Sequence, residues 1–321
     1  MLIEYKKAVT KILALFLIYS IIGLFLKSKP SISTFSNINS TDLKLRAENT
    51  KVLIYNRVPK CGSTTITAVL EKSKKNAKSK VGKIINHVLP QEKHYFLNQT
   101  EAQEFTKTIS DLAHRSTKSV YIRHVFFPRY KNVEMNKVQF FNVIRHPIDQ
   151  FISWYYYERN GWADHKSNPD WERTWSHKIN EATRNLTIDQ CIEQNFPECT
   201  KPGFNSEYLS YFCGQNKFCK SPSTIKALNQ ALKNLEEGYL FVGILEDLDS
   251  TLKILEIIFP DFFTGGYEIY KNIVKKRNMK TENKNYPNTK NLKVLTEKLK
   301  LEIKLYNHVL TKFNNIKSQL I

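Results

Sequence analysis

Residues 55–65 of this chain carry side chains that suit a phosphate-like group. The apolar run Val52–Tyr55 leads into them, and a helical pattern with Ile66, Val69 and Leu70 follows. That order predicts a strand, a tight loop and a helix. Because backbone N–H groups at a helix start form an anion pocket, this P-loop-like segment is predicted to hold an anion.

The loop residues suit that pocket individually. Gly62 lets the chain turn closely, Ser63, Thr64 and Thr65 add hydroxyl donors, and Lys60 adds a positive charge. A nucleoside-triphosphate P-loop has its Lys directly after the last Gly, whereas here Lys60 precedes Gly62. The loop therefore indicates a group-transfer enzyme of another kind. The alternative is a surface turn that only caps a helix, since Ser and Thr are ordinary N-caps.

A second segment with the same chemistry follows the apolar run Val138–Ile144. Arg145 comes at the end of that predicted strand, and Ser153 lies about two turns into the helix that Pro147 begins. Arg presents a planar fork suited to phosphate oxygens, which a hydroxyl can complete. The alternative is an Arg that caps a strand end and a Ser on a polar helix flank. Two anion-fitting segments, each after a strand, favour a binding site.

The elements that position these segments predict an α/β fold with a mainly parallel central sheet flanked by helices. Four short apolar runs are typical of buried strands: Val52–Tyr55, Val120–His124, Val138–Ile144 and Tyr239–Ile244. Helices are expected after Pro147, over Leu248–Phe259 and over Lys290–Lys317, and the basic segment 271–293 is expected to be a loop. Ligands of such sheets bind at the carboxyl ends of the strands.

The composition allows one large domain with a strong positive charge. The chain has 321 residues, 41% of them hydrophobic, and a formal net charge of +19. Such a charge favours a polyanionic partner, which is nucleic acid, an anionic membrane or a sulfated glycan. The alternative is a solvated, Lys-rich surface.

The N-terminal region predicts a single transmembrane helix. Ile12–Leu26 carries no charge, and back to Ala8 the apolar stretch is interrupted only by Lys11. No A-x-A-like cleavage site follows, which favours an uncleaved anchor over a signal peptide. The predicted organisation is a cytoplasmic tail and signal-anchor (1–27), a polar stem (28–50) and a lumenal domain (51–321).

Sequons and cysteines agree with a lumenal domain. N-x-[ST] triplets occur at Asn39, Asn98 and Asn185. Four of the five cysteines cluster, at Cys191, Cys199, Cys213 and Cys219, without a C-x-x-C pair, so disulfides are favoured over zinc. The spacing leaves three pairings open, and free buried thiols are the alternative. The anchor and the sequons argue against nucleic acid as the partner.

The motifs resemble those of sulfotransferases, which use 3'-phosphoadenosine 5'-phosphosulfate (PAPS). Pro-Lys-x-Gly-Ser-Thr resembles their 5'-phosphosulfate loop, and Arg-x-Pro with Ser eight residues after the Arg resembles their 3'-phosphate motif. From Lys51 onward, further segments resemble the uronyl 2-O-sulfotransferase family: 57–60, 121–126, 153–157, 211–214, 241–246 and the spacing of the four cysteines.

Within that family, two short segments distinguish the branches. Arg123-His124-Val125 and Cys213-Gly214-Gln215 look more like the chondroitin/dermatan branch. The heparan sulfate 2-O-sulfotransferase branch has a second His two residues before the catalytic one, and Ile122 occupies that position here.

The resemblance assigns roles residue by residue. It implies that His124 is the catalytic base, that Lys60 contacts the bridging oxygen of the sulfuryl group, and that Arg57 lies on the substrate side. It implies that PAPS is bound by Lys60, Cys61, Gly62, Ser63, Thr64, Thr65, Arg145, Ser153, Lys280 and Thr281. It also implies disulfides between neighbouring cysteines, Cys191–Cys199 and Cys213–Cys219, a homotrimer, and a type II protein of the Golgi membrane that needs no metal.

The chemistry requires the same residue types. A sugar hydroxyl is a poor nucleophile, and a His near its ordinary pKa can accept its proton during attack on sulfur. Lys60 and loop N–H groups can stabilise the departing phosphate, as in phosphoryl transfer. His146 beside Arg145 is a rival base, and Cys61 is interpreted as a small packing residue. The predicted reaction is 2-O-sulfation of hexuronic acid in chondroitin or dermatan sulfate, with heparan sulfate as the alternative acceptor.

Two other functions stay open on the sequence alone. Tyr239–Leu245 followed by Glu246 and Asp247 could be a metal-binding strand end of a kinase-like phosphotransferase that uses ATP and Mg²⁺. The charge of +19 could instead belong to a non-catalytic, glycan-binding membrane protein, which would show salt-sensitive binding without turnover.

Overall fold

The computed structural model describes residues 40–87, 95–128, 136–160, 181–200, 208–220, 224–274, 281 and 283–321. The predicted anchor, the sequon at Asn39 and the predicted site residue Lys280 lie outside these residues. Among the residues described, no helix is both long enough and apolar enough to cross a membrane.

Five parallel strands form the centre of the described domain, in the order β2-β3-β1-β4-β5. Their bounds are β1 Val52–Tyr55, β2 Val81–His87, β3 Lys118–Arg123, β4 Val138–Ile144 and β5 Tyr239–Ile244. Every residue of β1 and β4 is buried, as expected for parallel strands with helices on both faces. The predicted parallel sheet is confirmed, with β3 displaced slightly toward the N-terminus.

Strand β2 was not predicted, and its position explains why. It is the edge strand beside β3, and its sequence mixes Gly82, Lys83 and Asn86 with only a few apolar residues. Apart from Val81, the residues of β2 are exposed or half-buried, so this strand lacks the continuous apolar run that revealed the other four.

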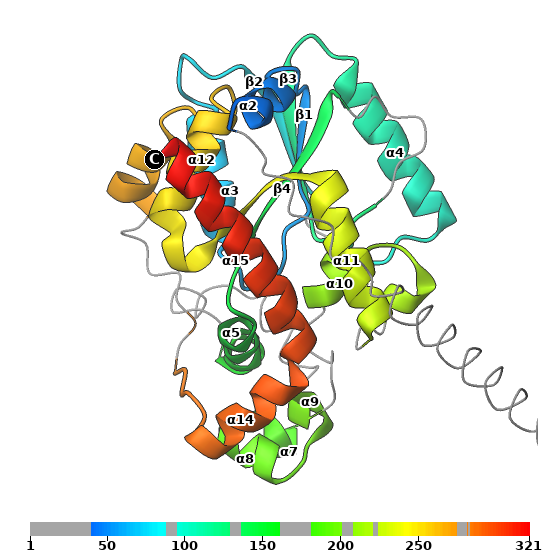
Figure 1. The fold of residues 1–321 in the computed structure, drawn as a ribbon, viewed down its shortest axis with the longest axis vertical. Coiled ribbons are helices and arrows are strands. Elements are labelled where there is room, and N and C mark those ends of the chain that lie inside the picture. Colours follow the sequence, from blue (N-terminus) through cyan, green and yellow to red (C-terminus); the bar gives the residue numbers. More distant parts are fainter. Residues whose placement is uncertain are drawn as a thin grey trace, which may run out of the picture. The chain divides into compact units, whose positions relative to one another are not determined.

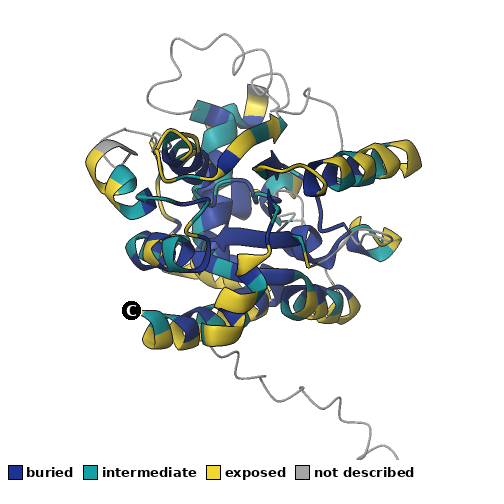
Figure 2. Cartoon of the chain, turned by 90° about the horizontal axis from the view of Figure 1, so that it is seen from above, coloured by how far each residue is buried: buried dark blue, intermediate teal, exposed yellow. Residues whose placement is uncertain are grey.

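Helices cover both faces of the sheet, with their exposed sides turned outward and the strands buried between them (Figures 1 and 2). Their bounds are α2 Ser40–Glu48, α3 Ser63–Ser73, α4 Gln99–Ala113, α5 Pro147–Asn160, α7 Glu181–Arg184, α8 Ile188–Glu193, α9 Pro197–Thr200, α10 Tyr208–Cys213, α11 Ile225–Gly238, α12 Leu248–Ile258, α13 Gly266–Ile269, α14 Thr289–Lys298 and α15 Lys300–Leu320. Short helical turns add η3 Lys217–Lys220, η4 Leu245–Asp247 and the π-helical η5 Tyr270–Val274.

Two boundaries differ from the prediction. The helix expected over 290–317 is two helices, because the chain leaves helical geometry at Leu299, which is buried in the core. Helix α2 lies inside the predicted stem, yet it buries Leu43 and Ala47 and contacts α12, α15 and β5. The compact domain therefore begins ahead of residue 51.

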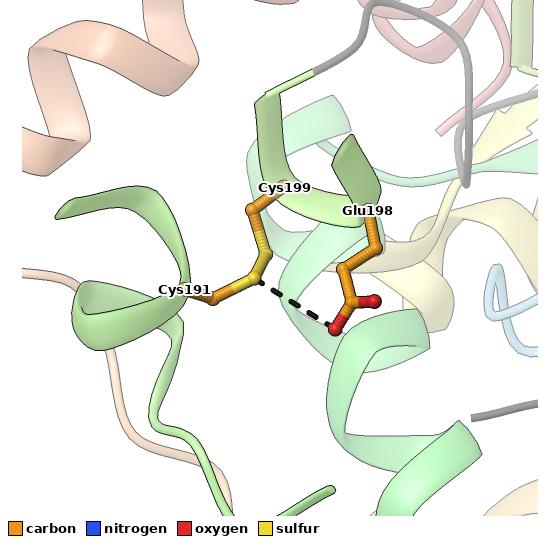
Figure 3. Close-up of side chains that lie close together, drawn as sticks. All are labelled: Cys191, Glu198 and Cys199. Carbon is orange, nitrogen blue, oxygen red and sulfur yellow. Dashed lines mark hydrogen bonds between the residues drawn. A yellow bond between two sulfur atoms is a disulfide. The ribbon is translucent and has the colours of Figure 1, made fainter. Parts of the chain in front are cut away.

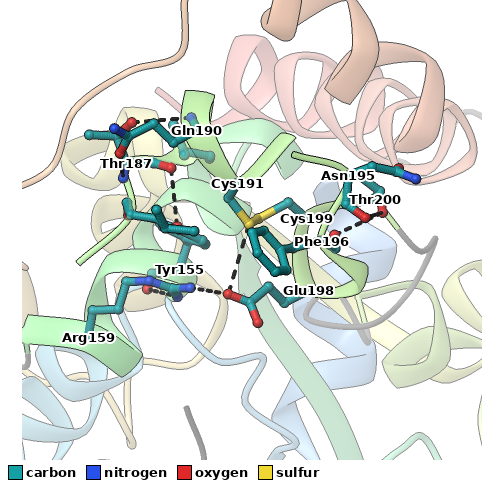
Figure 4. The surroundings of a disulfide bond; sticks show 12 residues. Tyr155, Arg159, Thr187, Gln190, Cys191, Asn195, Phe196, Glu198, Cys199 and Thr200 are labelled. Carbon is teal, nitrogen blue, oxygen red and sulfur yellow. Dashed lines mark hydrogen bonds and ion pairs between the residues drawn. A yellow bond between two sulfur atoms is a disulfide. The ribbon is translucent and has the colours of Figure 1, made fainter. Parts of the chain in front are cut away.

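The predicted disulfide pairs are confirmed. Cys191 joins Cys199 and Cys213 joins Cys219, with Cα–Cα distances of 6.0 and 5.5 Å. Around the first disulfide, Arg159 at the end of α5 pairs with Glu198 (Figure 4). The Arg159 guanidinium also stacks 3.5 Å above the Tyr155 ring. Helix α5 is thus fixed at the end opposite its start at Pro147.

Candidate active site

The loop between β1 and α3 has the backbone geometry of an anion site. Lys60 has a φ of 61° and Gly62 a φ of 76°, and a Cβ on Gly62 would lie 2.5 Å from Leu245 Cδ1. A positive φ is costly for a Lys and is typical of functional sites. No side chain caps the start of α3, so its first N–H groups are available to a ligand.

The charges of two other cations act on Lys60 in this loop. Burial, and then the charges of Arg145 and Lys284, lower the pKa of Lys60 to about 7. The Lys60 ammonium also lies 3.7 Å from the centre of the Tyr157 ring. An anionic ligand would offset the repulsion between these positive charges, so the loop favours binding of an anion.

The side chains of the loop divide between packing and exposure. Cys61 is a free thiol with no exposed surface, and burial is the main cause that raises its pKa to about 12. The Cys61 side chain therefore packs in the core, and only the backbone of this residue can contact a ligand. Ser63 is buried, Thr65 is half-buried and Thr64 is exposed.

The start of α5 lies beside the loop. Gln150 Nε2 donates to Pro59 O at 3.1 Å, and Tyr208 Oη donates to Arg145 O at 2.9 Å. One turn further on, Ser153 Oγ is 3.3 Å from Thr281 Oγ1, and both side chains are buried. The structure thus brings predicted donor-binding residues from distant parts of the chain to neighbouring positions.

His124 follows β3 and faces the same loop. Its Nδ1 lies 2.8 Å from Arg57 O and 3.3 Å from Tyr211 Oη. Because a carbonyl oxygen only accepts, Nδ1 carries the hydrogen, and the neutral ring therefore has its lone pair on Nε2. Arg57 N in turn donates to Arg123 O at 3.1 Å, so the loop and the end of β3 are joined by backbone.

The electrostatic state of His124 differs from the prediction. The sequence suggested an ordinary pKa, but burial and then the charge of Arg57 lower it to about 3. The imidazole is therefore neutral near pH 7, as an acceptor of protons must be. An anion paired with Arg57 would offset the positive charge of Arg57, and this would raise the pKa of His124.

The residues of the rival interpretations are engaged elsewhere. The His146 ring packs edge-on against Tyr306 at 5.2 Å, and its backbone N donates to Glu246 Oε1 at 2.8 Å. Asp247 caps α12 and pairs with Lys317 at 2.6 Å. Glu246 and Asp247 thus serve the packing of α12 and α15 rather than an open metal site.

Within the described ranges, one cluster has the spacing of metal ligands: Cys191, Glu198 and Cys199 (Figure 3). Its two sulfurs are joined as a disulfide and carry no thiolate. Glu198 Oε1 lies 3.9 Å from Cys191 Sγ, a contact rather than a hydrogen bond because no S–H remains. The Glu198 carboxylate pairs with Arg159, so the cluster is structural.

The two sequons among the described residues are accessible. Asn185 is exposed in the turn after α7, and Asn98 is exposed as the N-cap of α4. The Asn98 side chain accepts from Glu101 N at 2.9 Å, and its amide nitrogen takes no part in that cap.

Four residues near the site were missed from the sequence: Gln150, Tyr95, Tyr211 and Lys284. Each reaches the site through a tertiary contact with a segment far away in the chain. Tyr211 lies in the segment 211–214 that resembles the family, and Lys284 follows Thr281 closely, but neither was assigned a role in the site.

An anion loop beside a neutral imidazole, at the carboxyl ends of parallel strands, is an arrangement of the α/β class that suits group transfer. The sequence profile of the sulfotransferase family matches residues 44–309. The chain belongs to that family.

Relatives with assigned names refine the comparison. The chain is 31% identical to uronyl 2-sulfotransferase of Mus musculus over 277 residues, which is 84% of this chain and 63% of that protein. It is 31% identical to uronyl 2-sulfotransferase of Homo sapiens over 83% of this chain and 63% of that protein. Heparan sulfate 2-O-sulfotransferase 1 of Homo sapiens is 27% identical, over 87% of this chain and 75% of that protein. The chain thus spans less than two thirds of the uronyl 2-sulfotransferases that it matches.

Proposed function

We propose that this chain transfers a sulfuryl group from PAPS to the 2-hydroxyl of a hexuronic acid in a glycosaminoglycan of the chondroitin or dermatan sulfate type. The observation that carries the proposal is the hydrogen bond of 2.8 Å that fixes neutral His124 to Arg57, three residues before Lys60 of the anion loop. A base and an anion site are thereby neighbours. The names of the relatives support this acceptor class.

The residues present fit the donor. Positive charge at Lys60, Arg145 and Lys284 and the uncapped start of α3 suit a nucleotide with several phosphate groups. The loop would hold the 5'-phosphosulfate, and Arg145 with Ser153 would hold the 3'-phosphate. PAPS supplies an activated sulfuryl group, whose bond from sulfur to the phosphate oxygen breaks as the new bond forms.

The protein's own groups provide the rest of the chemistry. His124 Nε2 accepts the proton of the acceptor hydroxyl as that oxygen bonds to sulfur. Lys60 and the N–H groups of α3 stabilise the negative charge that moves onto the departing phosphate. Arg57, whose buried Nε has no hydrogen-bond partner, pairs with the carboxylate of the reacting uronic acid. The products are a sulfated sugar and 3'-phosphoadenosine 5'-phosphate.

The chondroitin or dermatan preference rests on the neighbourhood of His124. Ile122, two residues earlier, is apolar and fully buried, so this position offers no polar group to an acceptor. Heparan sulfate is the alternative acceptor, because heparan sulfate 2-O-sulfotransferases are also among the relatives.

The proposal includes the setting of the enzyme. We infer a type II protein of the Golgi membrane, anchored through residues 8–26, with the catalytic domain in the lumen, sequons used there, and a homotrimeric assembly. Two disulfides support an oxidising compartment.

The test is a transfer assay with labelled PAPS and separate chondroitin, dermatan and heparan sulfate acceptors, followed by disaccharide analysis. We expect label on the uronic acid O-2 of chondroitin or dermatan units. Label only on hexosamine O-6 would contradict the position, and label only on heparan units would contradict the branch. A parallel arm with ATP and Mg²⁺ tests the kinase-like alternative, and salt-sensitive glycan binding without turnover would indicate a binding protein.

A further inference from the structure

Next to His124, two segments that are distant in the sequence form a surface outside the proposed donor site. It consists of Tyr95, Phe96, Gln215 and Lys220, and we name it the acceptor-side surface. Tyr95 and Phe96 lead into α4, whereas Gln215 lies in the loop that the Cys213–Cys219 disulfide closes and Lys220 directly follows that loop.

Gln215 joins the two segments rigidly. Its Oε1 accepts from Leu97 N at 2.8 Å. Its Nε2 donates to Phe126 O at 2.8 Å and to Tyr95 O at 3.2 Å. Phe126 N also donates to Tyr95 O at 2.8 Å. One amide side chain thus links the segment before α4, the chain after β3 and the disulfide loop.

The disulfide loop itself is fixed in place. Gly214 has a φ of 94°, and a Cβ there would lie 2.5 Å from Phe127 O. Ser210 Oγ donates to Cys219 O at 2.6 Å, and Asn234 Nδ2 donates to Cys213 O at 2.9 Å. The loop is therefore preorganised, which lowers the entropy that a ligand loses on binding to it.

The surface joins two aromatic rings and a basic side chain. The Tyr95 ring lies 5.9 Å from the His124 ring. The next residue, Phe96, lies under Lys220, whose ammonium is 4.0 Å from the ring centre. Lys220 and Lys217 are both exposed on η3.

Sugars and their anionic groups match these side chains. The C–H faces of a sugar ring carry slight positive charge and pack against the negative face of an aromatic ring. A carboxylate or sulfate pairs with an ammonium group. We propose that the acceptor-side surface binds the sugar next to the one that receives the sulfuryl group, with Tyr95 against that sugar and Lys220 on its anionic group. This inference rests on the proposed function and specifies where the rest of the acceptor chain lies.

The test compares two charge reversals of equal size. Lys217→Glu with Lys220→Glu reverses the charge of Lys220 in the acceptor-side surface and of the exposed lysine that shares η3 with it. Lys74→Glu with Lys75→Glu is the matched control, because both lysines are exposed beyond the end of α3 that is opposite to the anion loop. Each pair is assayed with a long glycosaminoglycan and with a short acceptor, a hexuronic acid glycoside that lacks the neighbouring sugar, and 3'-phosphoadenosine 5'-phosphate binding is measured by calorimetry.

We expect the first pair to raise KM for the long acceptor about tenfold, since the ion pair of Lys220 becomes a repulsion and Lys217→Glu adds a second negative charge beside it. Its KM for the short acceptor and its nucleotide affinity should stay unchanged, and the control pair should leave all three values unchanged. Tyr95→Leu, which removes the aromatic face, should raise KM for the long acceptor as well.

Equal effects of the two lysine pairs, or an unchanged KM in the first pair and in Tyr95→Leu, would overturn this inference alone. Absence of transfer to any glycan by the unaltered protein would instead contradict the proposed function.

Discussion

The donor side and the acceptor side of the site are built differently. The donor side comes from short stretches that each follow a strand, residues 59–65 after β1 and 145–153 after β4. The acceptor side gathers single residues from separate elements. Gln215 and Tyr95, which are hydrogen-bonded, lie 120 residues apart in the chain.

This difference follows from the chemistry of the two ligands that we propose. Phosphate groups are bound by backbone N–H groups and charges, which one loop and one helix start supply together. A sugar chain has to be oriented over a larger area, and that requires side chains from several elements held by tertiary contacts. Variants on the two sides should therefore separate donor binding from transfer.

The largest effect should come from His124→Ala on the acceptor side. We expect transfer to fall about a thousandfold or more, because the hydroxyl loses its general base. Affinity for 3'-phosphoadenosine 5'-phosphate, measured by calorimetry, should stay largely intact. His146→Ala is the matched variant and should keep most of the rate. Near-normal turnover in the folded His124→Ala variant would show that His124 is not the general base.

Arg145→Ala should produce the reverse pattern on the donor side. A charge-assisted contact to phosphate is lost, so we expect nucleotide affinity to fall about ten- to a hundredfold while KM for the acceptor changes little. Arg115→Ala, an exposed Arg in the turn after α4, serves as the control. Unchanged calorimetric affinity in Arg145→Ala would make Arg145 a structural residue only.

Tyr211→Phe should have an intermediate effect and sharpen the acceptor side. The hydroxyl lies 3.3 Å from His124 Nδ1 and helps to orient the ring. We expect kcat to fall about tenfold with unchanged nucleotide affinity, because orientation is lost while the ring stays in place. The control is Tyr155→Phe. The Tyr155 hydroxyl, which this variant removes, donates to Leu186 O at 2.8 Å in the cluster around Cys191. Equal rates of both variants would show that Arg57 O alone positions the base.

The smallest effect concerns the protonation of Lys60. Its pKa of about 7 in the free protein means that the ammonium is charged below pH 7 and loses its proton above it. A bound anion favours the charged form, so nucleotide binding at pH 8 should take up close to one proton, and affinity should fall as pH rises from 7 to 9. Calorimetry in buffers of different ionisation enthalpy measures this uptake.

Lys60→Arg supplies the control for that measurement. Arg stays charged throughout this pH range, so the variant should bind nucleotide without taking up a proton. Persistent uptake in Lys60→Arg would assign the titration to another group.

Sequence reasoning succeeded where local chemistry decides the structure. The inner strands β1 and β4 were recognisable because they are buried on both faces and therefore mostly apolar. The anion loop was recognisable because its Gly, Lys and hydroxyl residues are consecutive. The disulfide pairs followed from the family resemblance and not from spacing.

Other features were decided by partners that the sequence does not reveal. Strand β2 exists because β3 offers it an edge, although its own residues are mixed. Helices α14 and α15 separate at Leu299 because that residue packs into the core around Cys191 and Cys199. These outcomes depend on tertiary contacts that outweigh local propensity.

The site shows the same division. The sequence by itself predicted an anion-binding loop, and the family resemblance predicted His124 as the base. Only the tertiary structure decided that Arg57 fixes the tautomer of His124 and lowers its pKa, and that Arg145 and Lys284 lower the pKa of Lys60. The physical reason is that electrostatic and hydrogen-bond energies depend on distance and burial in space, which sequence separation does not specify.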